Sequence, residues 1–75
     1  MNNYQEKIKE LTSLEIGWDG YNGVPVSQKL ADIASNLLKE LPNENWQLVP
    51  GSDGSIQIEI HKKYYSIEID ITHAK

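Results

Sequence analysis

The last third of the chain alternates apolar and polar residues with a period of two. The apolar series consists of Ile56, Ile58, Ile60, Tyr65, Ile67, Ile69 and Ile71. The polar series consists of Gln57, Glu59, His61, Ser66, Glu68, Asp70 and Thr72. Successive side chains of a strand point to opposite faces, so the pattern predicts antiparallel strands with one buried and one solvated face. We expect strands at about 46–49, 55–61 and 64–72.

The same alternation predicts the register of a three-stranded meander. The expected partners across the last turn are Ile60–Tyr65, Ile58–Ile67 and Ile56–Ile69, and those across the loop at 50–54 are Leu48–Ile56 and Trp46–Ile58. A slip of one residue would set isoleucines against carboxylates and reverse the faces of one strand.

Two earlier segments space apolar residues at helical intervals. In the first, at about 3–15, these residues are Tyr4, Ile8, Leu11 and Leu14, and in the second, at 28–41, they are Leu30, Ile33, Ala34, Leu37, Leu38 and Leu41. Gly17 is expected to end the first helix, Ser27 to cap the second and Pro42 to end it. Since neither layer is stable alone, we expect one α+β domain over 1–75, of order α-α-β-β-β, with both helices on one face of the meander.

The segment GWDGYNGVPVS, within an expected glycine-rich loop at 16–26, links the two helices. Asn22-Gly23 is a turn signal, and the Asp19 carboxylate can accept hydrogen bonds from amides one or two residues on. Trp18 and Tyr21 supply apolar area that a small core lacks. Two interpretations stay open: a structural link pinned by Trp18, and a binding site formed by Trp18, Asp19 and Tyr21.

This loop, the helix that ends in proline and the "VPGSDGSIQIEI" strand entry resemble a family of small bacterial and phage-borne proteins. That family has a Trp-Asp-Gly-Tyr-Gly…Pro motif, then a helix, then Asp-Gly-Gly before a strand. The resemblance covers residues 11–71 and implies a helix followed by a β-meander. The chain departs from the family at Ile60-His61, where a tryptophan is usual, and at Ser55, where a second glycine is common.

Charge and composition limit the partners and the compartment. The net charge of −4 disfavours direct contact with nucleic acid and favours a larger, basic protein as partner. Expected partner-binding residues are Trp18, Asp19, Tyr21, Glu59, Glu68 and Asp70. The isoleucine-rich last strand also makes a homodimer an expected possibility, formed either by edge pairing or by an uncovered remnant of the apolar sheet face. No apolar run has the length to span a membrane, no signal peptide is visible, and cysteine is absent, so we expect the cytoplasm of a bacterium or phage host.

The sequence contains no strong catalytic or metal-binding motif, so we expect no enzyme activity, cofactor or metal. The carboxylates Glu59, Glu68 and Asp70 share a solvated sheet face, which lacks the low-dielectric pocket that acid–base catalysis needs. His61 and His73 with Glu59 or Asp70 match no established metal spacing. The sequence GSDG at 51–54 is too short for a calcium loop. Lys62 and Lys63 are interpreted as charged residues that protect the neighbouring apolar strand from aggregation.

The sequence therefore favours a small acidic protein-interaction module. It would inhibit or adapt a larger protein, and a phage or mobile-element anti-defence protein, as anti-CRISPR proteins are, is a concrete version. A first alternative is a homo-oligomer that binds a small ligand or nucleotide, with Trp18 and Tyr21 stacking and amides near Gly20 and Gly23 meeting its polar groups. A second alternative is an antitoxin or immunity partner.

Overall fold

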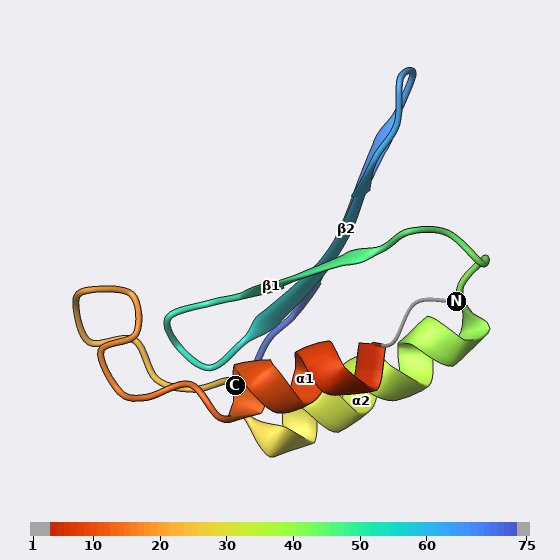
Figure 1. Cartoon of the computed structure of the whole chain (residues 1–75). Helices are drawn as coiled ribbons and strands as arrows, with labels where there is room; N and C mark the ends of the chain where they lie inside the picture. The colour runs from red at the N-terminus through yellow and green to blue at the C-terminus, as the bar shows by residue number, and fades with distance from the viewer. Residues whose placement is uncertain (1–3, 74–75) are drawn as a thin grey trace.

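Two helices lie against one face of a three-stranded antiparallel sheet (Figure 1). The computed structural model describes residues 4–73. Its elements are α1 (Tyr4–Thr12), α2 (Gln28–Glu40), β1 (Gln47–Pro50), β2 (Ile56–His61) and β3 (Ser66–Ile71), and the sheet order is β1-β2-β3. The predicted α-α-β-β-β order and the α+β class are therefore confirmed. None of the helices in this part of the chain has the length and apolarity required to cross a bilayer.

The start and end of α2 follow the sequence signals. The Ser27 hydroxyl accepts a hydrogen bond from the Leu30 amide at 3.5 Å, and the Leu41 amide closes the last turn on the Leu37 carbonyl. One predicted core residue is wrong, because Ile33 is 45% exposed. The small residues Ala31 and Ala34 are fully buried and let the helix approach its neighbours closely, which leaves Ile33 at the margin of the contact.

Helix α1 is shorter than the predicted 3–15, and residue 3 lies outside the described residues. It ends at Thr12, whose hydroxyl donates to the Lys9 carbonyl at 3.1 Å, and the Ser13 amide donates to the Glu10 carbonyl at 3.2 Å. These bonds close a tight last turn. The prediction that Gly17 ends the helix is therefore wrong, and its positive φ of 88° serves the following loop instead.

Both predicted registers are wrong by two residues. The observed partners are Ile60–Ile67, Ile58–Ile69 and Ile56–Ile71 between β2 and β3, and Leu48–Ile58 and Pro50–Ile56 between β1 and β2. The hairpin turns at Lys63–Tyr64, because the Lys62 amide donates to the Tyr65 carbonyl at 2.8 Å. The strands nevertheless begin and end within one or two residues of the predicted bounds. A shift of two keeps every side chain on its predicted face, so the hydrophobic pattern alone could not exclude it.

The core lies between the helices and the apolar sheet face. Its buried members are Ile8, Leu11, Val26, Leu30, Ala31, Ala34, Trp46, Leu48, Ile56, Ile58, Ile60 and Ile71. Ile58, on the central strand, is 0% exposed. Toward its turn the β2–β3 hairpin rises away from both helices (Figure 1), and the apolar side chains there lose their cover.

Candidate functional site

The part of the β2–β3 hairpin that projects beyond the helices, here called the outer hairpin (residues 60–67), has an exposed apolar side. Tyr65 is 53% and Ile67 42% exposed, whereas Ile60 beside them is buried. An apolar groove of about 190 Å³ lies at its base. Its lining consists of Leu41, Pro42, Glu44, Trp46, Ile60, Tyr65, Ile67 and Ile69.

The wall of this groove is held by three hydrogen bonds to the segment that follows α2. The indole nitrogen of Trp46 donates to the Pro42 carbonyl at 3.0 Å. The Tyr4 hydroxyl donates to the Glu44 carbonyl at 2.8 Å and accepts from the Trp46 amide at 3.0 Å. Since these bonds exist in the isolated chain, the groove is formed before anything binds to it.

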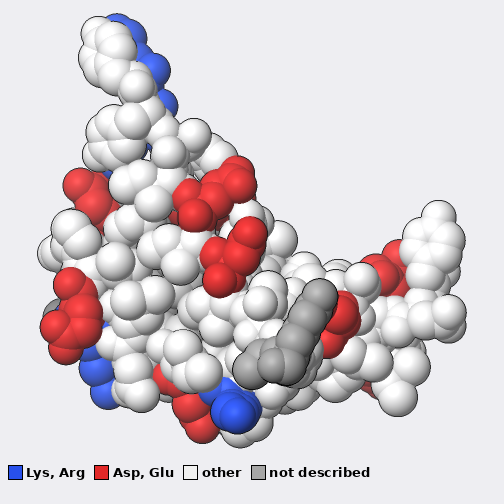
Figure 2. Space-filling model, turned by 180° about the vertical axis from the view of Figure 1, so that it is seen from behind, with Lys and Arg blue, Asp and Glu red and all other residues white. Residues whose placement is uncertain are grey.

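An ion pair joins the groove to the outer hairpin. The Lys62 ammonium lies 2.9 Å from the Glu44 carboxylate. The hydrogen bond to this carboxylate and its negative charge raise the pKa of Lys62. Lys63 lies over the Tyr64 ring, 5.3 Å from its centroid. The projecting tip is thus basic and aromatic, while acidic side chains gather lower on the molecule (Figure 2).

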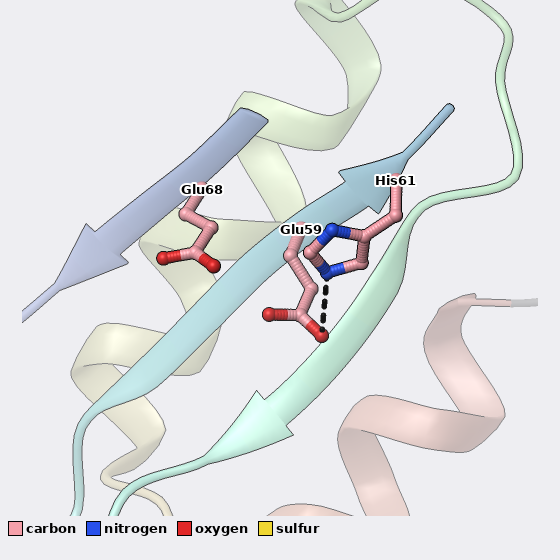
Figure 3. Close-up of side chains that lie close together, drawn as sticks. All are labelled: Glu59, His61 and Glu68. Carbon is pink, nitrogen blue, oxygen red and sulfur yellow. Dashed lines mark ion pairs between the residues drawn. The ribbon is translucent and has the colours of Figure 1, made fainter. Parts of the chain in front are cut away.

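The polar face of the sheet sets carboxylates directly across from one another. Glu59 on β2 pairs with Glu68 on β3, and Asp70 lies opposite Gln57. Like charges in directly opposite positions are destabilising. Two neighbours relieve this pair: Gln57 donates its amide to Glu68 at 3.2 Å, and the His61 ring lies 3.4 Å from the Glu59 carboxylate (Figure 3).

The same three side chains could hold a metal ion. Glu59, His61 and Glu68 each offer one ligand atom, and these atoms lie within 4.8 Å of one another. Two carboxylates and an imidazole are donors that Zn²⁺ accepts. However, His61 already pairs with Glu59 along β2, Glu68 accepts a hydrogen bond from Gln57, and both His61 and Glu68 are exposed, so these contacts account for the cluster without an ion.

The glycine-rich loop closes on itself. The Asp19 carboxylate accepts from the amides of Tyr21 and Gly23, each at 3.0 Å, which confirms the predicted Asx turn. The indole nitrogen of Trp18 donates to the Val24 carbonyl at 2.7 Å. A Cβ on Gly23 would lie 2.7 Å from the Asp19 carboxylate, so this close approach requires glycine.

Neither aromatic residue of this loop belongs to the core, so the prediction that they add core volume is wrong. Trp18 is half-buried against the loop itself, and Tyr21 is 84% exposed. The tip of the loop closes through the Gly17 amide, which donates to the Gly23 carbonyl, and it projects away from the helices and the sheet (Figure 1). The base of the loop is tied to the remainder of the fold, because the Val24 amide donates to the Ser52 carbonyl and the Val26 amide to the Leu11 carbonyl. The six predicted partner-binding residues therefore fall into two groups, with Trp18, Asp19 and Tyr21 on this loop and Glu59, Glu68 and Asp70 together on the polar sheet face.

Sequence reasoning missed the apolar groove. Its walls come from the segment that joins α2 to β1, from the end of β2 and from the Tyr65–Ile69 stretch of the last strand, and no short motif marks their meeting. The available signal was Tyr64-Tyr65, an aromatic pair that follows Lys62-Lys63 at an expected turn, where polar residues are usual. Aromatic side chains beside a turn are typical of contact surfaces.

Comparison of the chain with protein-family models, with curated proteins and with solved structures finds no match. The outer hairpin, the polar sheet face and the glycine-rich loop are thus the features from which a function is inferred.

Proposed function

We propose that this protein is a small interaction module that binds a larger protein through its outer hairpin and thereby inhibits or adapts it. The observation that carries the proposal is the exposed apolar side of that hairpin, where Tyr65 and Ile67 flank a preformed groove. Exposed apolar surface rimmed by charged residues marks binding sites in small soluble domains. Here Lys62 and Glu44 supply such a rim.

The chemistry of this surface suits a protein more than a small molecule. Tyrosine and tryptophan are enriched among the residues that dominate the binding energy of protein interfaces, and Tyr65 and Trp46 line the groove. Ligand pockets for small molecules occupy about 300–1,000 Å³, whereas the groove offers about 190 Å³.

Two of the loop amides nearest to the donors of the ligand-binding alternative are already used within the loop. The Gly20 amide donates to the Gly17 carbonyl at 2.9 Å, and the Gly23 amide donates to Asp19. A ligand stacked on Tyr21 would find these amides occupied. At this groove and at this loop, protein interaction is therefore better supported than ligand binding.

Within this class we favour a basic partner in a bacterial cytoplasm. The chain carries a net charge of −4, and its polar sheet face presents Glu59, Glu68 and Asp70 together. Such a face attracts a protein surface that normally holds nucleic acid. An anti-defence inhibitor that occupies a basic groove is the specific version of this proposal.

Affinity capture from the native host with matched variants tests the proposal. The wild type, Tyr65→Ser on the outer hairpin and Tyr21→Ser on the loop serve as baits at low and high salt. Both tyrosines are exposed, so neither variant is expected to unfold the chain. We expect one host protein to be retained by the wild type and by Tyr21→Ser, and to be lost from Tyr65→Ser.

Two results contradict the proposal in different ways. Loss of the partner from Tyr21→Ser alone would move the site from the outer hairpin to the loop. Retention of no protein by any bait at low salt would remove the interaction module altogether, while a complex indifferent to salt would remove only the acidic contribution.

A further inference from the structure

We propose that β3 accepts, along its free edge, an extended segment of the partner protein in which apolar residues alternate with lysine or arginine. The inference rests on the proposed function and names the chemistry of its partner. It starts from the sheet order, in which β3 is an edge strand. An edge strand presents unpaired backbone groups that template a further strand.

The register shows which backbone groups of β3 face outward. Hydrogen-bonded and non-hydrogen-bonded pairs alternate along an antiparallel ladder. The bond from the Lys62 amide to the Tyr65 carbonyl sets the phase, so Ile67 and Ile69 exchange bonds with β2. The amides and carbonyls of Ser66, Glu68 and Asp70 consequently point to the free edge.

A strand added at this edge would meet two different surfaces. On one face its side chains lie beside Ile67 and Ile69, which continue into the apolar groove. On the other face they lie beside Glu68 and Asp70, both exposed. Opposite charges across neighbouring strands are favourable. An added strand therefore fits best with apolar residues facing the isoleucines and basic residues facing the carboxylates.

A second copy of the chain fits this edge poorly. If β3 of one copy pairs antiparallel with β3 of another, two registers pair five residues of each strand and keep the apolar faces of both sheets on the same side. The first places Glu68 opposite Glu68 of the other copy, and the second places Glu68 opposite Asp70 twice. Since directly opposed carboxylates repel, homodimerisation through this edge is disfavoured near neutral pH. The predicted homodimer remains a competing outcome of the test.

Synthetic decapeptides provide the probe for this site. One alternates valine with lysine, a second alternates valine with glutamate, and a third has the first peptide's composition in scrambled order. Each is titrated at low salt into the full chain, and amide chemical shifts and amide exchange rates are recorded. We expect the lysine peptide to bind at least about tenfold more tightly than the glutamate peptide, with slowed exchange at the amides of Ser66, Glu68 and Asp70.

Charge reversal supplies the matched controls. The double variant Glu68→Lys with Asp70→Lys should exchange the preference, so that the glutamate peptide binds more tightly. The double variant Glu15→Lys with Glu40→Lys makes the same change of net charge at positions outside β3 and should keep the wild-type preference. All four positions are exposed, and dispersed amide spectra verify that each variant is folded.

Several results would overturn the inference. Equal binding of the scrambled or glutamate peptide would show no strand recognition, and shifts confined to other elements would place the site elsewhere. Concentration-dependent protection of the three β3 amides in the free protein would assign the edge to a second copy. If the lysine peptide fails while a host protein is still captured through Tyr65, strand addition is wrong and the interaction module stands.

Discussion

Replacing Ile58 and Ile67 by alanine, one at a time, measures how far the helices cover the hairpin. Both isoleucines lie on the apolar face of the β2–β3 hairpin, and the chemical change is identical. Ile58 is 0% exposed and Ile67 is 42% exposed. The pair therefore isolates the effect of cover from that of residue type.

The structure predicts clearly different losses of stability. For Ile58, the lost transfer free energy and the cavity together give about 2–5 kcal/mol. Ile67→Ala removes three carbon groups, each worth about 0.8 kcal/mol of transfer free energy when fully buried. Reduced in proportion to the 42% exposure of Ile67, the expected loss is about 1.4 kcal/mol. No closed cavity forms, because the site opens on solvent. The free energy of unfolding of a 75-residue domain is about 4–11 kcal/mol, so Ile58→Ala should remove a large share of it.

Urea unfolding followed by far-ultraviolet circular dichroism gives both free energies of unfolding. The measurement is repeated at two protein concentrations, because a dimer would make the midpoint depend on concentration. If Ile58→Ala does not fold, Ile58→Val and Ile67→Val replace the pair, with an expected loss of about 0.5–1.5 kcal/mol for Ile58→Val and less for Ile67→Val. Equal losses at both positions would show that the outer hairpin is covered, and would refute the site described above.

Three further changes test other contacts. Ser27→Ala removes the α2 cap and should lower the free energy of unfolding by about 1 kcal/mol in urea titrations. Hydrogen bonds from the Ser55 hydroxyl and amide lower the pKa of Asp53 below its ordinary 3.8, so its contribution is present above that pH and is lost on acidification; the stability difference between wild type and Asp53→Asn should shrink in acid denaturation curves. The pKa of Lys62 is raised above 10.5 by Glu44, so its contribution is present below that pH, and the stability difference between wild type and Lys62→Gln should vanish as the pH rises through the raised value.

Sequence periodicity determined the elements and their faces, but it did not determine how strands are paired. A two-residue shift preserves every face, so only the turn could select between registers, and Lys63–Tyr64 carries no residue that marks a turn. Local chemistry was predictable where it involved near neighbours, as for the Asp19 carboxylate and the Tyr21 amide.

Tertiary geometry explains why the candidate site was incompletely predicted. The exposure of Tyr65 and Ile67 depends on the direction in which the hairpin leaves the helices, which no local pattern encodes. The grouping of Glu59, Glu68 and Asp70 was foreseeable, because it requires only the alternation of side chains along β2 and β3. Its direct Glu59–Glu68 opposition required the observed register.

The Asx turn at the tip of the glycine-rich loop also provides a site for attaching a label. Tyr21 contributes its amide to that turn, while its side chain is 84% exposed and lies outside the core. The chain has no cysteine, so Tyr21→Cys would carry its only thiol. A fluorophore attached there would follow tumbling and complex formation in solution from a position remote from the surface that is proposed to bind.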